Sequence, residues 1–448
     1  MAAAGSAIGL GSLWRFPYVA GDSGGGAFVL LYIIFTILIG LPVFIGELII
    51  GRHTQKGAIL SFAHFEKAGN WKFIGWLNLI TCIIILSYYA VVSGWCLSYI
   101  LMSISQFSTG KTPEEIRNVF DILVASPDIN LFWLFFFLLL NFGVVFSGIR
   151  KGIEYWSRIL TPALLFILVG MFIYSLFLSG FKEAAAFILL PDFSKITPTV
   201  VLNALGMSFF TLSVGLGIIV TYGSYMRRDE DIPKTGLIVT VMSLFVSLMA
   251  ALTIFPIVFT YNFPAQGGVG LVFKTMPVIF ANIPGSLVIS TVFFTLFVFT
   301  ALTSSISLLE VVVANFMEVF HMSRGKAVIK SCVGIFVIGI PSALSGANQL
   351  FPHWKDVYGK NFFDTMDYIT ASWMMPIAGL LTTIFIGWFL NKQFIRQEFE
   401  MGTTYKKIFH IWYWAVRYLA PFAVILIILQ EAGILEVNKL ISLIVKKS

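Results

Sequence analysis

The sequence predicts an all-α polytopic membrane protein with about 11 transmembrane helices. Its 448 residues are 58% hydrophobic and only 11% charged, and the mean hydropathy is +0.91. Soluble domains are far more polar than this. Apolar runs of about 20 residues, the length that crosses ~30 Å of hydrocarbon, recur along the whole chain. These two observations exclude a soluble globular protein.

The apolar runs give the spans in order. Two of them, near 2–21 and 196–225, qualify only if glycine-rich interruptions are tolerated. The connections are short except near 107–131, 262–283 and 346–362, so we expect a single membrane domain, 1–448. The continuous runs lie near 26–50, 73–105, 131–147, 157–180, 233–261, 284–318, 327–345, 363–390 and 409–430.

The positive charges in the loops predict the orientation. The loops near 51–72, 148–158, 227–234, 320–330 and 391–407 together hold 17 lysines and arginines, whereas the opposite set with the C-terminal tail holds 10. Loops rich in lysine and arginine stay in the cytoplasm. We therefore expect a multi-pass protein of the cell inner (plasma) membrane, with a cytoplasmic N-terminus and an extracytoplasmic C-terminus.

The net charge of +7 and the three cysteines indicate no other class of protein. No basic helix or soluble module presents the charge, so the expected partner is the lipid bilayer and not a nucleic acid. Cys82, Cys96 and Cys332 lie in apolar runs without disulfide or zinc spacing. No obligatory protein partner is evident, and we expect a short N-terminal segment to be missing before Met1.

The two interrupted spans share the tripeptide GLG, at Gly9–Gly11 and again at Gly215–Gly217, 206 residues later. Serine or threonine stands beside both copies, in GSAIGLGS and FFTLSVGLG. Glycine also serves close helix packing in membranes, which is the alternative reading. A break in the helix, however, frees backbone N–H and C=O groups that lipid cannot satisfy. Paired interruptions of this kind are typical of a transporter site for a carboxylate and small cations.

The stretch GSAIGLGSLWRFPYVAGDSGGGAF, together with FFTLSVGLGIIVTYGSY, LTSS and FFDTMDY, resembles the neurotransmitter:sodium symporter family. The resemblance is to its bacterial amino-acid transporter branch, which includes the leucine and hydrophobic-amino-acid transporters, and it runs along nearly the whole chain. It implies inverted five-helix repeats at 1–180 and 196–390, an additional helix 11 at 405–432, and unwound helices 1 and 6 that hold substrate and sodium.

The resemblance implies two sodium ions, with one ion as the alternative. Ser12 and Ser243 stand where the family usually has asparagine, so the first site departs from the family pattern. Hydroxyls on a helix can instead bond their own helix carbonyls. Site 1 is expected to use Ala7, Ser12, Thr211 and Ser243, and site 2 the carbonyls of Gly5, Ile8 and Thr300 with the hydroxyls of Thr303 and Ser304.

The resemblance also implies a substrate pocket without a buried charge. Gly9 stands where monoamine-carrying relatives have aspartate, which favours a substrate that brings its own carboxylate. That carboxylate is expected at Leu10, Gly11 and Tyr89, the ammonium at Ala7, Phe210, Thr211 and Ser213, and the side chain at Ile85, Phe210, Leu216, Ser304 and Leu308, with Ser6 beside them.

Gates, a helix-5 motif and a chloride site follow from the same resemblance. Glu47 and Glu310, two further acids in apolar runs, are expected to pack with satisfied hydrogen bonds. The arginine partner of the inner gate would precede Met1. The outer gate is expected at Arg15 and Asp367, the inner gate at Tyr225 and Glu318, the helix-5 unwinding at Gly152 and Pro162, and chloride at Tyr32, Thr211, Ser243 and Ser247.

We therefore predict a sodium-coupled symporter, not an enzyme, that takes up neutral, hydrophobic or aromatic L-amino acids by alternating access. A transporter of another small zwitterion is the alternative. A membrane-embedded serine hydrolase would need a base near a nucleophile such as Ser304, yet all five histidines lie at span ends or in loops. A channel is disfavoured by the paired charges expected at the outer gate.

Overall fold

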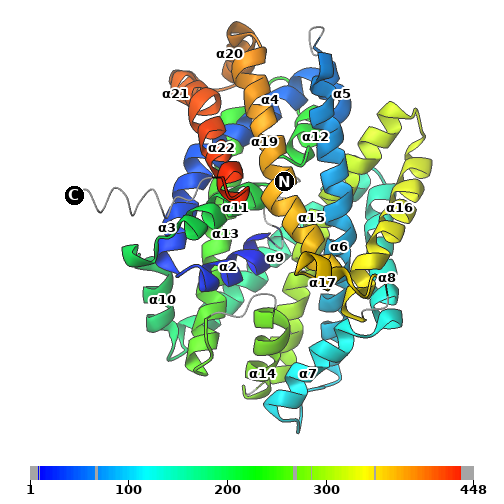
Figure 1. Ribbon diagram of the computed structural model, residues 1–448, viewed down its shortest axis with the longest axis vertical. Helices are drawn as coiled ribbons and strands as arrows, with labels where there is room; N and C mark the ends of the chain where they lie inside the picture. Colours follow the sequence, from blue (N-terminus) through cyan, green and yellow to red (C-terminus); the bar gives the residue numbers. More distant parts are fainter. Residues whose placement is uncertain are drawn as a thin grey trace. The chain divides into compact units, whose positions relative to one another are not determined.

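The computed structural model describes Gly9 and residues 11–65, 69–265, 270–283, 285–347 and 350–434. Within these residues the regular structure is entirely helical (Figure 1). The predictions made for Gly5, Ser6, Ala7, Ile8 and Leu10 lie outside the described residues.

The nine continuous spans of the prediction are confirmed in the part of the chain described. Each corresponds to one helical stretch of at least 18 residues that is apolar enough to cross a membrane. Several of these stretches are α-helices joined by a π-helical turn, as at Thr36–Gly40. They cover Gly26–Thr54, Gly69–Ile104, Pro127–Phe146, Ile149–Leu176, Ile232–Thr260, Ser286–Val319, Arg324–Ala347, Trp354–Phe389 and Lys406–Gln430.

The two remaining spans are those in which the sequence predicts an interruption. Near the N-terminus a π-helical turn at Gly11–Arg15 leads into α2, Phe16–Asp22. The other span consists of α11, Pro198–Leu212, and α12, Ile218–Ser224, separated by five residues that are not helical. The predicted helix break in the second GLG segment is therefore confirmed.

The chain divides into two compact units, each made of three separate stretches of the sequence. Unit 1 contains Met1–Asp22, Cys82–Leu189 and Phe245–Tyr368. Its helices after α2 are the later part of α6 (Lys72–Ile104), α7 (Pro113–Val124), α8 (Pro127–Phe146), α9 (Tyr155–Leu176), α10 (Phe181–Leu189), the later part of α13 (Ile232–Thr260), α14 (Met276–Ala281), α15 (Ser286–Val319), α16 (Arg324–Leu344), α17 (Trp354–Tyr358) and α18 (Phe362–Tyr368).

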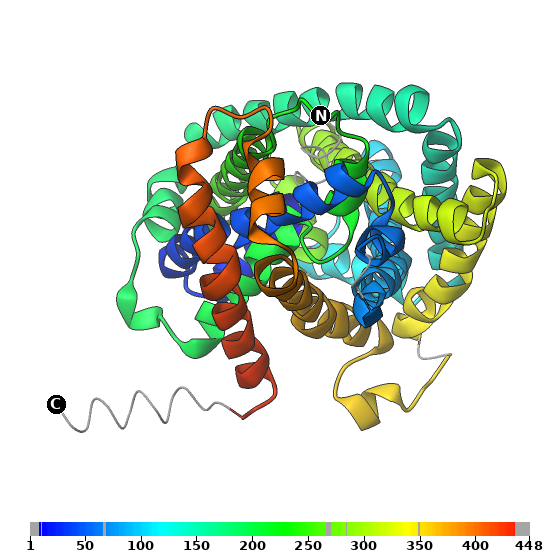
Figure 2. The same ribbon diagram turned by 90° about the horizontal axis from the view of Figure 1, so that it is seen from above.

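Unit 2 contains Ser23–Thr81, Leu190–Leu244 and Ile369–Ser448. Figure 2 gives a second view of its last helices, drawn in orange and red. Besides α11, α12 and the first parts of α6 and α13, its helices are α3 (Gly26–Phe35), α4 (Leu41–Thr54), α5 (Ala58–Ala63), α19 (Met375–Ile384), α20 (Lys392–Glu400), α21 (Phe409–Trp414) and α22 (Ala420–Glu431).

Close helix packing in unit 2 holds the interrupted span against α4. A Cβ atom on Gly51 would lie 2.0 Å from the carbonyl oxygen of Val220, and one on Gly223 would lie 2.8 Å from that of Leu48. Without side chains, the two backbones can approach this closely. The alternative reading, that glycine serves close packing, therefore applies to the α4–α12 contact. It applies in part to the second GLG segment as well, because Gly215 and Gly217 lie in the helix break and also pack closely against neighbouring residues.

In unit 1, buried polar side chains join the long helices. Ser305 of α15 donates a hydrogen bond to Asn141 of α8 at 2.7 Å. Arg324 at the start of α16 reaches the fully buried carboxylate of Glu310 with two hydrogen bonds, of 2.6 and 3.1 Å. This confirms that Glu310 packs with its oxygens satisfied.

Candidate functional site

The break between α11 and α12 places two glycines in left-handed backbone conformations. Gly215 has φ 77° and Gly217 has φ 70°, and Ser213, which is not glycine, has φ 55°. A Cβ on Gly215 would lie 2.6 Å from the carbonyl oxygen of Met375. Both the backbone conformation and the available space therefore require glycine at position 215.

The break frees a backbone N–H, which a buried acid accepts. Glu47 of α4 is fully buried, and its Oε1 accepts the N–H of Gly215 at 2.8 Å. An unpaired N–H at this depth would cost several kcal/mol, of the order given for apolar surroundings. Glu47 therefore helps to hold α11 and α12 apart as two half-helices. Its Oε2, however, is buried and forms no hydrogen bond with any residue that the structure describes, so the prediction that Glu47 packs with satisfied hydrogen bonds is wrong for this oxygen.

The N-terminal segment is described from Gly9 onward, except for residue 10. Gly9 lies in a bend, and its carbonyl accepts the N–H groups of Ser12 at 3.0 Å and Leu13 at 3.3 Å. Among the described residues, the first helical turn is the π-helical one at Gly11–Arg15. The side chain of Ser12 is fully buried.

The outer charged pair predicted at Arg15 and Asp367 is in contact. Arg15 Nη1 donates to Asp367 Oδ1 at 2.8 Å, and both side chains are partly exposed, at 17% and 29%. Tyr88 of α6 donates its hydroxyl to the same oxygen at 3.1 Å. Sequence reasoning missed Tyr88, although it directly precedes the predicted Tyr89.

Three of the residues predicted for chloride lie together in unit 2, and two of them were also predicted for sodium site 1. Tyr32 donates its hydroxyl to Thr211 Oγ1 at 3.0 Å, and Thr211 Oγ1 donates onward to the carbonyl of Met207 at 3.0 Å. Ser243 Oγ lies 3.5 Å from the carbonyl of Thr211, at the limit of a hydrogen bond. Ser247, one turn further along α13, is fully buried.

The hydroxyl residues predicted for sodium site 2 lie on α15. Thr303 Oγ1 donates to the carbonyl of Thr300 at 2.9 Å, and Thr300 Oγ1 donates to that of Leu296 at 2.7 Å. Both threonines are buried, and Ser304 is half-buried. The threonine hydroxyls thus bond carbonyls of their own helix, which is the alternative that the sequence left open. Their role as ligands stays a prediction.

The residues predicted to bind the substrate divide between the two units. In unit 1, Ile85 and Tyr89 of α6 and Leu308 of α15 are buried to at least 96%. In unit 2, Thr211, Ser213 and Leu216 are buried where α11 ends. Phe210 and Ser304 are half-buried.

The inner-gate residues also belong to different units. Tyr225 ends α12 in unit 2 and is exposed, with its ring 6.5 Å from that of Tyr222. Glu318 lies in the last turn of α15 in unit 1.

Gly152 and Pro162, predicted for the helix-5 motif, lie at the start of span 5. Gly152 lies in a π-helical turn at Ile149–Glu154, where a Cβ would lie 1.9 Å from the carbonyl oxygen of Val144. Pro162 lies inside the α-helix that follows. The role of this segment in helix unwinding stays a prediction.

Comparison with known proteins identifies the family. The model of the Sodium:neurotransmitter symporter family matches residues 1–115 and 125–441. The chain belongs to this family. Family members are transporters and not enzymes, so this chain is a sodium-dependent transporter and a multi-pass membrane protein.

Relatives of this family match the chain over nearly its full length. A sodium-dependent transporter of Bacillus subtilis (strain 168) is 37% identical, covering 97% of this chain and 96% of the relative. One from Haemophilus influenzae is 34% identical, covering 96% of each. The crystal structure of MhsT in complex with L-phenylalanine superposes with a TM-score of 0.88 at 38% identity, covering 96% of each chain. The predicted fold class is thereby confirmed, whereas the repeat boundaries stay predictions.

Proposed function

We propose that this transporter takes up neutral, hydrophobic or aromatic L-amino acids with sodium by alternating access. The observation that carries the proposal is the broken span 6, where Gly215 and Gly217 open the helix. A helix opened in this way has free backbone N–H and C=O groups, which can bind a ligand. The likeness to MhsT, which was crystallised with L-phenylalanine, supports a hydrophobic substrate.

The substrate would lie beside the breaks in spans 1 and 6. Its carboxylate would meet Leu10, Gly11 and Tyr89, and its ammonium would face backbone carbonyls near Phe210. No acid is proposed in the pocket, because Gly9 leaves the substrate to supply the carboxylate. A large side chain would then lie among apolar residues, where burial favours it by about 25 cal/mol per Å².

Sodium would bind at two sites, each built from neutral oxygens. Hard oxygen ligands without a cluster of carboxylates suit a monovalent ion that must bind and then leave. Serine at positions 12 and 243 is shorter than asparagine, so a single ion is the alternative. Chloride is a second candidate ion at Tyr32, Thr211 and Ser243, whose hydroxyls would have to turn from their present acceptors to donate to the anion.

Arg15 and Asp367 would close the outer side, with Tyr89 and Phe210 beneath them, while Tyr225 and Glu318 would act on the inner side. Spans 1, 2, 6 and 7 would move against the remaining spans, and unwinding at Gly152 and Pro162 would admit water toward sodium site 2. In the proposed orientation, the protein lies in the cell inner membrane with its N-terminus in the cytoplasm. The loops of the lysine- and arginine-rich set support this orientation.

The driving force is sufficient for uptake against a gradient. A potential of 100 mV is worth about 2.3 kcal/mol per charge, and a tenfold sodium gradient adds about 1.4 kcal/mol. One sodium ion could therefore sustain accumulation on the order of several-hundred-fold.

Uptake of labelled amino acids into proteoliposomes tests the proposal. We expect phenylalanine and leucine to enter only with sodium outside, and potassium or choline to fail as replacements. Equal uptake with and without sodium would refute symport. If sodium drives the uptake only of a different zwitterion, the substrate class alone is refuted. Replacing chloride in the same assay tests the second ion.

The substitution Gly9→Asp tests the substrate pose. A carboxylate at position 9 would repel that of an amino acid, so we expect uptake of amino acids to fall at least tenfold. Gly9→Ala is the control for steric effects. Unaltered uptake by the aspartate variant would contradict the pose.

A further inference from the structure

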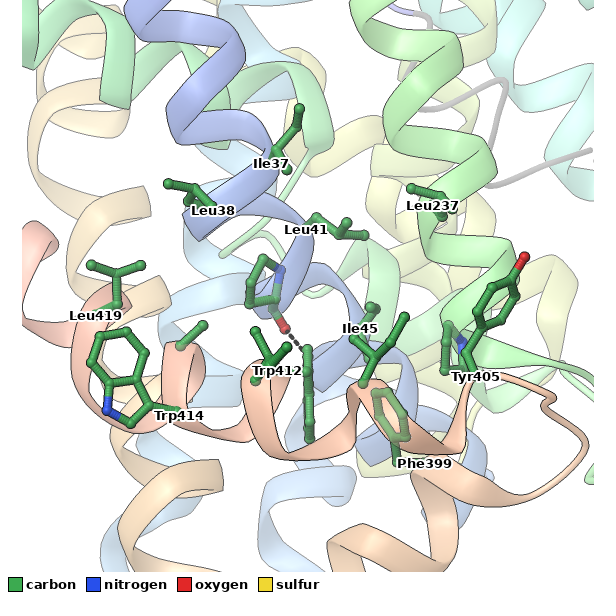
Figure 3. A pocket seen from close by; sticks show the side chains of 15 residues that line it. Ile37, Leu38, Leu41, Ile45, Leu237, Phe399, Tyr405, Trp412, Trp414 and Leu419 are labelled. Atoms are coloured by element: carbon green, nitrogen blue, oxygen red, sulfur yellow. Dashed lines mark hydrogen bonds between the residues drawn. The ribbon is translucent and has the colours of Figure 1, made fainter.

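An apolar groove opens on the membrane-spanning part of unit 2. It has a volume of about 330 Å³ and lies between α4, the first turns of α13 and the segment that leads from α20 through α21 (Figure 3). Its floor includes Phe399 and Trp412, whose ring centroids are 4.8 Å apart. The indole N–H of Trp412 donates to the carbonyl of Pro42 at 3.0 Å, so this polar group is satisfied. The floor therefore offers apolar surface.

The rim of the groove is exposed and apolar. Ile37 and Leu38 contribute from one side, Leu237 from another, and Ile411 is 71% exposed. These residues belong to helices long and apolar enough to cross a membrane. The groove is therefore open to lipid hydrocarbon along spans 2, 7 and 11.

One end of the groove carries positive charge. Lys406 and Lys407 stand between Tyr405 and Ile408, both of which line the groove, and Lys234 directly follows the lining residue Pro233. All three lysines are exposed, and none forms an ion pair with a residue that the structure describes.

Most acids near this end of the groove pair with arginines. Asp229 and Glu230 lie 3.7 and 3.5 Å from Arg227. Glu400 pairs with Arg396 at 2.6 Å. Asp231 accepts the backbone N–H of Lys234 at 2.9 Å and keeps its negative charge, which lies beside that lysine. The charges of Lys406 and Lys407 are therefore the ones most available to an anion from outside the chain.

We propose that the groove holds an acyl chain of an anionic phospholipid whose phosphate lies at Lys406, Lys407 and Lys234. An acyl chain gains little by leaving lipid for an apolar groove, because the two surroundings are alike. Selection among lipids therefore falls to the headgroup, and basic residues between transmembrane helices bind anionic headgroups. Tyr405 and Trp414, exposed beside the groove, are residue types that favour the headgroup level.

Native mass spectrometry of the detergent-purified, full-length protein tests the headgroup contact. The probes are phosphatidylglycerol and phosphatidylcholine with identical acyl chains. Each lysine at an anionic headgroup is worth about fivefold in affinity. We expect phosphatidylglycerol to bind in preference, and the double variant Lys406→Gln/Lys407→Gln to lose about 25-fold in that affinity.

The matched control is Lys326→Gln/Lys330→Gln, which removes the same charge from exposed positions on α16 in unit 1. It should leave binding of phosphatidylglycerol unchanged. Equal binding of the two lipids, or equal losses in the two double variants, would overturn the proposal.

The groove itself is tested with Leu237, which is 43% exposed and should tolerate substitution. Leu237→Trp fills the groove and should reduce bound phosphatidylglycerol, whereas Leu237→Ala should retain it, with melting temperatures confirming that both fold. If Leu237→Trp leaves the binding of phosphatidylglycerol unchanged, the proposed site is wrong. A mass of two chains without bound phospholipid would assign the groove to a second copy and also overturn it. The measurement is of lipid binding alone, so its result is independent of the transport proposal.

Discussion

Asp367 accepts hydrogen bonds from both Arg15 and Tyr88, so a single carboxylate oxygen joins three elements of unit 1. A charge in a partly buried place is costly unless it is paired. Removing the charge of the acceptor should therefore weaken the contact more than removing the neutral Tyr88 donor. Two substitutions distinguish these cases.

Asp367→Asn should reduce amino-acid uptake at least tenfold, because Arg15 then loses its counter-charge and the proposed outer gate cannot close in the same way. Tyr88→Phe should slow uptake by about fivefold or less, since one neutral donor is worth about 1 kcal/mol. Initial uptake rates into proteoliposomes measure both effects. Tyr174→Phe on α9 is the control, and wild-type rates for Asp367→Asn would contradict the gate.

Gly215 offers a second test at a single residue. Gly215→Ala should destabilise the protein by at least about 1–2 kcal/mol, because alanine at a positive φ is strained and its Cβ would approach the carbonyl of Met375. The melting temperature in detergent and the uptake rate should both fall. Gly206→Ala is the matched control, since that Cβ meets no atom within 4 Å and alanine favours the helix. Equal stability of the two variants would contradict the account of the break.

At the scale of elements, the buried side chain of Arg52 joins the end of α4 to α20 by hydrogen bonds and an ion pair. Its guanidinium reaches Glu398 Oε2 at 3.1 Å and the carbonyl of Glu230 at 2.7 Å, and it also donates to the carbonyl of Glu398. His53 contacts the other carboxylate oxygen of Glu398 at 3.0 Å. The connection after span 10 is thereby held to span 2.

Arg52→Gln should cost about 3–5 kcal/mol of unfolding free energy, because it leaves a largely buried carboxylate without its charged partner. Arg396→Gln on the same α20 removes an arginine from the more exposed pair with Glu400, and should cost about 1 kcal/mol or less. Denaturation in detergent micelles compares the two variants. Similar losses of unfolding free energy in the two variants would show that burial does not make the Arg52–Glu398 pair more stabilising than the exposed one.

The elements differ in how far sequence predicts them. The nine long spans were predictable because apolar length alone determines a membrane helix, and the break before Gly215 was predictable because glycines interrupt the apolar run. The contact of Arg52 with Glu398 was not, since it joins residues 346 positions apart and no local pattern pairs them. Tyr88 was missed for a related reason, because only tertiary packing decides which of two adjacent tyrosines faces Asp367.

For the whole molecule, the number of sodium ions decides how steeply uptake follows the sodium gradient. In coupled transport the accumulation ratio rises with the sodium ratio to the power of the ions carried, because each ion adds the same free energy per tenfold gradient. Proteoliposomes clamped at zero potential, with sodium ratios varied over tenfold, give this power directly. Two proposed sites predict an accumulation ratio that rises about 100-fold, whereas one ion predicts about tenfold.

The same measurement, repeated on variants, shows which residues are needed to carry each sodium ion. Thr303→Ala/Ser304→Ala should lower the power by one if these hydroxyls bind sodium, because an ion that is no longer carried contributes no driving force. Ser307→Ala on the same helix, whose hydroxyl bonds the carbonyl of Thr303, is the control and should leave the power unchanged. An unchanged power in the double variant would mean that these hydroxyls only bond their own helix, and site 2 would then have to be sought elsewhere.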